Sequence, residues 1–299
     1  MHVARGDGAL RALLAELPAG PGARELVART AARLAARAPQ LSWLLLATER
    51  RGHGFIAATW RPVARGAPRV HALVVDRRHV VHSDAETVAS LAAARDGTDL
   101  LTHQRWCEVL GRDALTRRFY RELERCIGML AEDALDADRT TTPTRAEAQD
   151  LALLCTSRLL FLCFLQAKGW LDGDRDWLAR RFAACMAEGG AFHRRVLLPL
   201  WFGTLNTPER RRAPAARALG ALPFLNGGLF ARAPVERRRR HARFSDAALG
   251  HLFDDVLVRY RFTAHEDATA FSDAAVDPEM LGRAFESLMA SAERRTSGV

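Results

Sequence analysis

The chain has 299 residues, of which 48% are hydrophobic, and this suffices for one large domain or two ordinary ones with a real core. Its five cysteines form no C-x-x-C pair and its N-terminus lacks the apolar core of a signal peptide, so we expect a cytoplasmic protein without disulfides. The formal net charge of +9 is unevenly placed, because residues 209–243 hold ten arginines against two glutamates, whereas residues 244–293 carry a balance of −7.

The N-terminal third predicts a mixed α+β fold. Residues 8–38 are rich in alanine, leucine and arginine with helical periodicity, and a cluster of proline and glycine divides them into two predicted helices. Short apolar runs at 41–48, 54–60 and 69–76 are separated by turn residues and predict a small antiparallel β-sheet. A helix is expected again over residues 84–94.

The rest of the chain predicts helices. Residues 113–135 form a long amphipathic pattern that ends near the polar stretch 139–143, which we interpret as a domain boundary. Thr144 and Glu147 then form a capping box for a helix that is apolar on most of its surface up to Lys168, and Gly169 is expected to end it as a C-cap. Its most apolar window is too short for a bilayer and contains Arg158, so we expect a buried helix and no membrane association.

Further helices are predicted near 175–187, 191–205 and 246–260, the last with Ser245 as its N-cap. A turn is expected at Asn226-Gly227-Gly228, where the glycines would supply positive φ. The tryptophans at 170, 177 and 201 lie in helical apolar patterns, which predict core packing. The fold class is therefore mainly α with a small antiparallel sheet near the N-terminus (α+β). The expected parts are a mixed domain over 1–140, a helical connector over 141–275, and a helix with the start of a linker over 276–299.

The last predicted helix has a well-marked beginning. Asp277 can cap it, Pro278 suits its first position, and Glu279 lies near the positive end of its dipole. Apolar side chains follow at the spacing of one helical stripe, so this helix needs a surface to pack against. The stripe consists of Met280, Leu281, Ala284, Phe285, Leu288 and Met289.

Three motifs occur in order along the second half of the chain: RLLFLCFLQAKGWL at 158–171, PFLNGGLF at 223–230 and VDPEMLGRAFESL at 276–288. Together they resemble motifs of large bacterial DNA adenine methyltransferases, especially the type IIG-like enzymes that are fused to restriction functions. In that family the third motif is followed by a basic stretch and by T-G-x-x-Y-T-P, which opens the methyltransferase domain. The family-motif positions of the last two stretches are Asn226, Gly227, Gly228, Asp277, Pro278, Glu279, Gly282, Phe285 and Glu286.

The resemblance stops where the family's catalytic domain would begin. Residues 296–299 read T-S-G-V, with Ser297 between the threonine and the glycine and without the Y-T-P part. The glycine-rich cofactor turn and the N-P-P-[YF] loop of the family are also missing from these 299 residues. We therefore expect no catalytic, cofactor-binding or metal-binding residue in this chain, and S-adenosylmethionine only in the complete enzyme. The expected partners are DNA and a methyltransferase domain or subunit encoded downstream.

The arginine-rich stretch supplies the candidate DNA contacts, because arginine is permanently charged and binds phosphate oxygens bidentately. A solvated loop that is arginine-rich through coding bias is a nearly equal alternative, since the chain has a single lysine. The DNA-contact candidates are Arg210, Arg211, Arg212, Arg237, Arg238, Arg239 and Arg240.

Other chemistry is not favoured by the residues. A nuclease would need acidic metal ligands followed by a lysine, and Lys168 lies in the apolar helix. The sheet at 41–76 could still be a degenerate nuclease-like region that keeps Glu49 and Asp76, although ordinary surface carboxylates explain both. The histidines at 79 and 82, with Asp76 and Asp84, match no standard zinc spacing.

The sequence thus predicts the N-terminal scaffold and connector portion of a DNA adenine methyltransferase or restriction-modification protein. Such a portion would be catalytically inactive alone, either as a truncated product or as half of a split enzyme. The alternative is a noncatalytic DNA-binding or adaptor subunit of a phage-defence system.

Overall fold

The computed structural model describes residues 2–5, 8–18, 22–61, 63, 66–95, 97–137, 143–225, 227–263, 271–283 and 286, with the backbone alone for 2–5 and 135–137. The chain divides into two compact units, and each consists of two segments. Unit 1 comprises residues 1–118 and 265–277, and unit 2 comprises residues 119–264 and 278–299. The division falls inside the long helix α4 (Arg112–Ala137), whereas the sequence predicted a boundary at 139–143.

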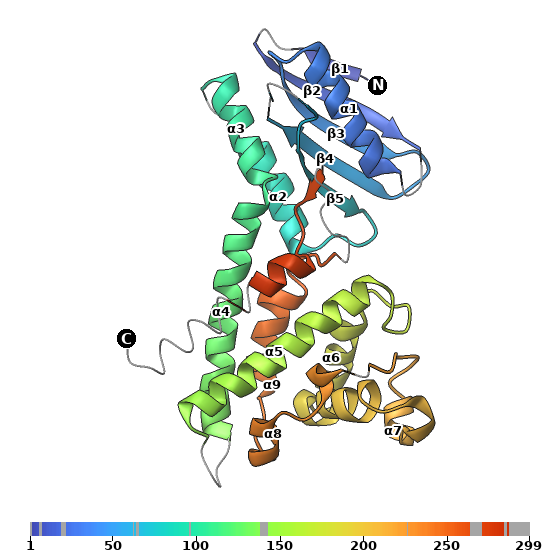
Figure 1. Cartoon of the computed structure of the whole chain (residues 1–299), viewed down its shortest axis with the longest axis vertical. Helices are drawn as coiled ribbons and strands as arrows, with labels where there is room; N and C mark the ends of the chain where they lie inside the picture. The colour runs from blue at the N-terminus through green and yellow to red at the C-terminus, as the bar shows by residue number, and fades with distance from the viewer. Residues whose placement is uncertain are drawn as a thin grey trace. The chain divides into compact units, whose positions relative to one another are not determined.

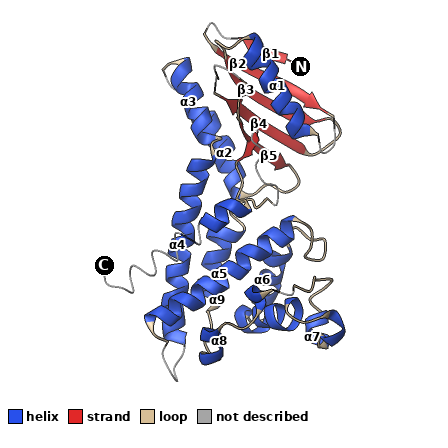
Figure 2. Cartoon of the chain, viewed as in Figure 1, coloured by secondary structure: helices blue, strands red, loops and turns tan. Residues whose placement is uncertain are grey.

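Unit 1 contains a six-stranded mixed sheet in the spatial order β1-β2-β3-β4-β5-β6 (Figures 1 and 2). Strands β3, β4 and β5 form an antiparallel meander, as predicted. β1 adds antiparallel to β2, whereas β2 pairs in parallel with β3 and β6 in parallel with β5. The strands are β1 (His2–Arg5), β2 (Leu10–Leu17), β3 (Ser42–Glu49), β4 (Gly54–Trp60), β5 (Val70–Asp76) and β6 (Phe271–Asp273).

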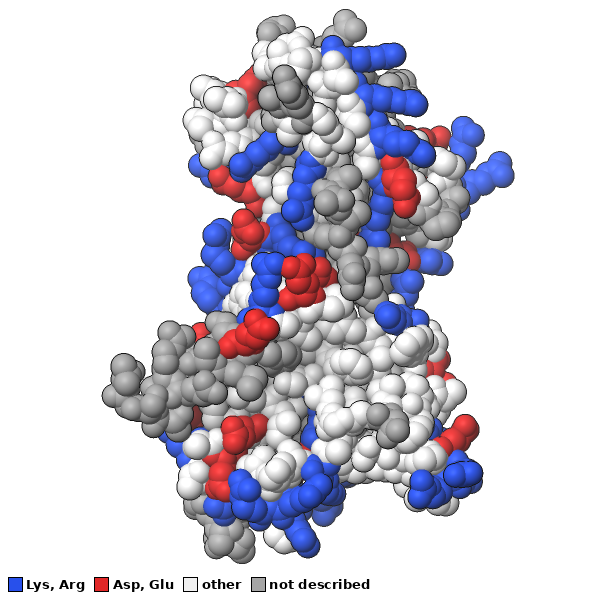
Figure 3. Space-filling model, in the orientation of Figure 1, with Lys and Arg blue, Asp and Glu red and all other residues white. Residues whose placement is uncertain are grey.

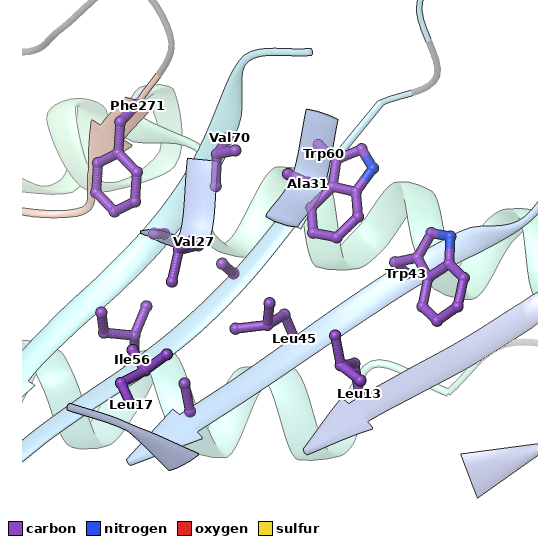
Figure 4. Packing of buried hydrophobic residues seen from close by; sticks show 13 residues of the cluster. Leu13, Leu17, Val27, Ala31, Trp43, Leu45, Ile56, Trp60, Val70 and Phe271 are labelled. Atoms are coloured by element: carbon purple, nitrogen blue, oxygen red, sulfur yellow. The ribbon is translucent and has the colours of Figure 1, made fainter. Parts of the chain in front are cut away.

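Each face of the sheet has its own hydrophobic core, because successive residues of a strand point to opposite faces. One core joins the strands to α1 (Ala23–Arg37) through Val27 and Ala31, and Figure 4 shows its packing. The other core joins them to α2 (His82–Ala93) and α3 (Asp99–Val109). Unit 1 is therefore a sheet with helices on both faces, and the predicted α+β class is confirmed.

The first of the two predicted N-terminal helices is in fact strand β2, so that prediction was wrong. β2 pairs with β3 along its whole length, from Leu10 opposite Ser42 to Leu17 opposite Glu49. Its burial alternates with period two, since Leu13 and Leu17 are buried and the intervening Leu14 is half exposed. Alanine and leucine favour helix in isolation, but pairing with a neighbouring strand outweighs that weak preference.

Unit 2 is helical. Its main elements are α4 from Phe119 onward, α5 (Arg145–Ala167), α6 (Trp177–Ala187), the π-helical segments η1 (His193–Leu197) and η2 (Pro199–Leu205), η3 (Glu209–Arg211), α7 (Pro214–Arg217), η4 (Gly228–Phe230), α8 (Pro234–Arg238), α9 (Asp246–Leu252) and η5 (Phe253–Leu257). Within unit 2, helices therefore lie near every range where the sequence predicted them. The Ser245 cap is confirmed, because its hydroxyl accepts a hydrogen bond from the Ala248 N–H at 3.1 Å.

Helix α5 is the buried centre of unit 2. The predicted capping box is present, since Thr144 Oγ1 accepts from the Glu147 N–H at 3.2 Å and the Glu147 carboxylate accepts from the Thr144 N–H at 3.2 Å. Gly169 follows the helix with φ of 76°, as a C-terminal glycine should. By length and composition α5 could cross a membrane, but 67% of its most apolar window is buried inside the structure.

Two sequence expectations in unit 2 require correction. Trp177 and Trp201 are buried as predicted, but Trp170 is 51% exposed, with the Lys168 ammonium 5.3 Å from its ring centre. Gly227 has φ of −138° and Gly228 begins the 3₁₀ turn η4, so neither has the positive φ that was expected. Asn226 lies outside the described residues. All five cysteines are free and buried.

The helix after Asp277 is confirmed over the described residues 278–283 and 286. Asp277 is buried and forms an ion pair with Arg112 of α4. Met280 and Leu281 are also buried, so this part of the apolar stripe is covered rather than exposed. Ala284, Phe285 and the later stripe residues lie outside the described part of the chain.

Candidate nucleic-acid interface

The predicted arginine cluster is centred on the short helix α8. Pro234 starts the helix, and the Glu236 carboxylate accepts a hydrogen bond from the Ala233 N–H at 2.8 Å, which satisfies a main-chain donor at the helix start. Basic side chains gather over α8 at the lower end of the view in Figure 3. Basic side chains are therefore concentrated around α8, but only some of these arginines lack an acidic partner among the described residues.

Two arginines of the cluster are paired with the capping glutamate of α5. Arg239 donates to Glu147 Oε2 from Nη2 at 2.7 Å and from Nε at 2.9 Å, and Arg238 donates to Glu147 Oε1 at 3.3 Å. The Arg239 hydrogen bonds, followed by the Thr144 N–H, lower the pKa of Glu147 to about 2. The Glu147 carboxylate is therefore ionised at neutral pH, and it neutralises part of the cluster.

Arg237 and Arg240 are exposed, and the Arg240 Nε donates to the Arg237 carbonyl oxygen at 3.3 Å. Arg210 and Arg211 are exposed in the turn η3, and no acidic partner of either lies among the described residues. These four guanidinium groups are therefore exposed and positively charged, as contact with a phosphate requires.

Arg212 does not belong with the DNA-contact candidates. Its side chain is buried, and its guanidinium donates to three main-chain carbonyl oxygens, at 2.9 to 3.1 Å. The acceptors belong to Thr207, Leu222 and Pro223. Arg212 thus holds two loop segments together, and its prediction as a DNA contact is corrected.

Arg158 connects two of the three sequence motifs. From the first motif, its guanidinium donates to the carbonyl oxygen of Leu229 in the second motif at 2.7 Å, and to that of Ala231 at 2.9 Å. It also forms a two-point ion pair with Glu236, at 2.6 and 2.9 Å, although it is completely buried. Four hydrogen bonds to these acceptors, together with the Trp201 and Phe202 rings whose centres lie 4.9 and 5.2 Å from the guanidinium carbon, compensate for the cost of burying the charge. The 158–171 and 223–230 motifs therefore form one structural unit.

A second basic surface was missed by the sequence analysis. Arg29, Arg33 and Arg37 recur every four residues on α1 and are exposed. No partner of any of the three lies within the described ranges. Four helical residues advance roughly 6 Å, so these charges form a ridge along the helix, and basic side chains project along α1 in Figure 3. The four-residue spacing inside a predicted helix could have identified this ridge.

The carboxylates that were considered as nuclease relics support turns. Glu49 Oε2 accepts a hydrogen bond from the Gly54 N–H at 3.0 Å in the β3–β4 hairpin, and Asp76 is paired with Arg78 at 3.1 Å. His82 contacts Glu86 at 3.0 Å. Asp84 accepts from the Val81 N–H at the start of α2, at 3.3 Å. Over the described residues, no group of three or more histidine, cysteine or acidic side chains is arranged to hold a metal ion.

Val276 and Asp277 of the third motif are the last residues of unit 1, and its other described residues lie in the helix that begins at Pro278. Pro278 opens the helix, and Glu279 is exposed and ion-paired with Arg283. Gly282 and Glu286 are exposed, and a Cβ on Gly282 would meet no atom within 4 Å. Nothing in the structure explains a requirement for glycine at this position.

Comparison with known proteins reveals a partial similarity. Over 148 residues, which make up 48% of this chain, the sequence is 28% identical to a protein of Methanocaldococcus jannaschii assigned as a candidate type II restriction enzyme and methyltransferase. The match spans 12% of the length of that relative. No family model matches the chain, and no solved structure matches it. The chain is thus similar, over about half its length, to a restriction-modification protein.

Proposed function

We propose that this chain is the scaffold and connector region of a DNA adenine methyltransferase or type IIG-like restriction-modification protein. The observation that carries the proposal is the 148-residue similarity to the M. jannaschii restriction enzyme and methyltransferase. In this proposal the chain has no methyltransferase activity alone. Its helical unit holds a methyltransferase core that binds S-adenosylmethionine, and its arginines contact DNA phosphates.

The exposed aromatic residues of unit 2 support the contact with a partner domain. Phe161, Trp170 and Phe224 are between 36% and 51% exposed, and all three lie in the motifs at 158–171 and 223–230. Large apolar side chains gain free energy when a partner removes them from water, so these three are candidates for contact with a partner domain. Figure 3 shows that the visible face of unit 2 over α5 carries few charged side chains.

The exposed arginines support contact with DNA. Arg237 and Arg240 of unit 2 and the α1 ridge of unit 1 project charge that no described carboxylate neutralises. Each arginine that pairs with a phosphate releases condensed counterions, which makes binding favourable at low salt and independent of base sequence. The specificity of the complete enzyme would then come from another domain.

The direct test is transfer of a labelled methyl group from S-adenosylmethionine to duplex DNA. The chain alone is expected to give background transfer, and a methyltransferase core supplied in the same reaction is expected to be activated by it. Replacing Phe161, Trp170 and Phe224 by serine should abolish the activation, whereas Val258→Ser, at a similarly exposed apolar position, should preserve it. Methyl transfer by the purified chain alone would refute the proposal.

The α1 ridge favours a second candidate, a noncatalytic DNA-binding or adaptor subunit of a phage-defence system. This candidate predicts salt-dependent DNA binding by the chain and no stimulation of any methyltransferase core. The same transfer assay therefore separates the two candidates, because stimulation excludes the second one.

A further inference from the structure

A groove lies between strand β2 and helix α1 in unit 1. Its volume is about 510 Å³, which is within the range of about 300–1,000 Å³ that is typical of small-molecule sites. Its lining is apolar apart from Glu16, Thr30 and Arg50. An apolar concavity with a few polar groups suits a ligand that has an apolar body and a polar edge.

The walls of this groove, and not its floor, are available to an occupant. Leu13, Val27 and Leu45 line the floor and are at most 1% exposed, and Figure 4 shows them among the packed core residues. The walls keep exposed surface. They consist of Ala15, Glu16 and Pro18 on the strand side, Leu26 and Thr30 on the helix side, and Arg50 after β3; together they define the α1 groove.

The polar groups of the α1 groove are accessible and can change partners. Arg50 Nε donates to Glu16 Oε2 at 3.2 Å, and the two side chains are 74% and 59% exposed. Such an exposed ion pair contributes little to stability, so a ligand can separate it at small cost. The Thr30 hydroxyl donates to the Leu26 carbonyl oxygen at 2.8 Å, which leaves the hydroxyl oxygen free to accept. The groove therefore offers the donors and acceptors that the edge of a nucleobase requires.

The α1 ridge runs directly beside this groove. Arg29 and Arg33 follow the wall residues Leu26 and Thr30 by three positions, and residues three apart are neighbours on a helix surface. From Arg29 to Arg37 the ridge extends roughly 12 Å, at about 1.5 Å per residue. One strand of a DNA duplex carries a phosphate about every 3.4 Å of axis, so it passes three or four phosphates along the ridge. An anionic lipid with one head group would engage a single arginine, so the charge spacing favours a nucleic-acid strand.

We propose that the α1 groove holds one unpaired nucleobase of a DNA strand whose backbone follows the α1 ridge. The faces of the base lie against the apolar walls, and its edge meets Glu16, Thr30 and Arg50. A base that is paired and stacked in an intact duplex cannot enter. The groove rests on the proposed DNA contact for its backbone, and it adds a preference for one form of DNA to binding that charge alone would leave unselective.

Two labelled duplexes of the same sequence test the groove, one fully paired and one with a single extra nucleotide that has no partner. Fluorescence anisotropy measures the affinity of the full chain for each at constant salt. The duplex with the unpaired nucleotide should bind about tenfold more tightly, which is the scale of one hydrogen-bonded base contact.

Two variants locate the preference in the groove. Thr30→Leu fills the groove and removes its hydroxyl, so it should abolish the preference and leave the affinity for the paired duplex unchanged. Ala32→Leu adds a bulky side chain to α1 outside the groove and should keep the preference. Circular dichroism checks folding. If Thr30→Leu does not fold, Glu16→Ala/Arg50→Ala, which removes one charge of each sign at exposed positions, should weaken the preference instead.

The outcomes separate the groove from the proposed DNA contact. Equal affinity for the two duplexes, or a preference that survives in Thr30→Leu, would overturn the groove, whereas salt-dependent binding of both duplexes would leave the DNA contact standing. Binding of neither duplex would contradict the DNA contact, and the groove would fall with it. Phosphatidylglycerol vesicles are the third probe: if the chain binds them and Thr30→Leu abolishes that binding, the groove holds an acyl chain and the assignment of a nucleobase is wrong.

Discussion

Two sets of arginines, one in each unit, have opposite surroundings. On α1 of unit 1, Arg29, Arg33 and Arg37 are exposed and have no partner among the described residues. In unit 2, Arg158 and Arg212 are buried and donate to carbonyl oxygens, and Arg158 is also paired with a carboxylate. The stretch with the highest arginine density therefore uses part of its charge to hold itself together. The number of arginines in a stretch of sequence therefore does not show how many of them are accessible or contact DNA.

The largest expected change in the free energy of unfolding follows substitution of the buried Arg158. Arg158→Met leaves Glu236 as a buried charge without its partner and two carbonyl oxygens without donors. Breaking a buried pair in this way costs about 3–5 kcal/mol. In urea denaturation, the midpoint concentration for the unfolding of unit 2 should therefore be lower in the Arg158→Met variant. Arg237→Gln, at an exposed position, should change the free energy of unfolding by less than about 0.5 kcal/mol, and equal losses in the two variants would contradict the contrast.

The next effect concerns the stability of unit 2 at mildly acidic pH. Burial, with a smaller contribution from Arg243, lowers the pKa of His193 to about 4, although Glu236 opposes the shift. The unfolded state therefore binds the proton more readily, so stability is full above about pH 6.5 and falls as the pH drops towards 4. The loss should reach roughly 3 kcal/mol.

His193→Phe removes that titrating group and should flatten the fall in stability between pH 6.5 and 4. The free energy of unfolding, measured by denaturant titration at several pH values, compares the two proteins. An identical pH dependence in both would show that His193 is not held neutral in the folded state.

The α1 ridge should affect DNA binding and leave stability unchanged. The triple substitution of Arg29, Arg33 and Arg37 by glutamine removes three exposed charges. The slope of log affinity against log salt concentration should become shallower by about 2.7, at about 0.9 per phosphate contact. Fluorescence anisotropy with a labelled duplex at several salt concentrations measures the slope.

A matched control removes three exposed arginines that are scattered over unit 2, at positions 121, 145 and 194. Its salt slope should change much less, because isolated charges do not follow a phosphate backbone. Equal slopes for the two triple variants would mean that net charge alone governs binding.

The smallest effect on stability is expected from the ion pair between Glu147 and Arg239. The pKa of Glu147 is about 2 because Arg239 and the Thr144 N–H donate to its carboxylate, so this stabilisation is present above about pH 4.5 and is lost as the pH falls towards 2. Glu147→Gln should make the melting temperature less sensitive to pH between 5 and 3. An unchanged sensitivity would show that the Arg239 contact contributes nothing.

Local sequence signals predicted the parts of the fold that depend on neighbouring residues. The Thr144–Glu147 box, the Gly169 helix end and the Ser245 cap involve residues a few positions apart, and all three are present. The same holds for the antiparallel meander of β3, β4 and β5, whose strands are joined by short turns. These features need no knowledge of distant partners.

Features that depend on distant partners could not be predicted in this way. Leu10 to Leu17 became a strand because β3 lies beside it, and Arg158 reaches Glu236 across 78 positions. Arg212 faces carbonyl oxygens of the two loops that flank it, so its sequence context resembled that of its exposed neighbours. The sequence therefore identified a stretch of high arginine density, but it did not distinguish the exposed arginines from those engaged inside the fold.

The short strand β6 has a practical consequence for dissecting the molecule. Because Phe271 to Asp273 pair with β5, and Asp273 forms a 2.8 Å ion pair with Arg24, unit 1 is completed only after the chain has passed through residues 119–264. A fragment cloned as residues 1–118 would leave the hydrogen-bonding edge of β5 open and uncover the buried Val70, which invites aggregation. Residues 119–264 are in effect an insertion into unit 1, so unit 1 is best isolated as residues 1–118 joined through a short linker to residues 265–277.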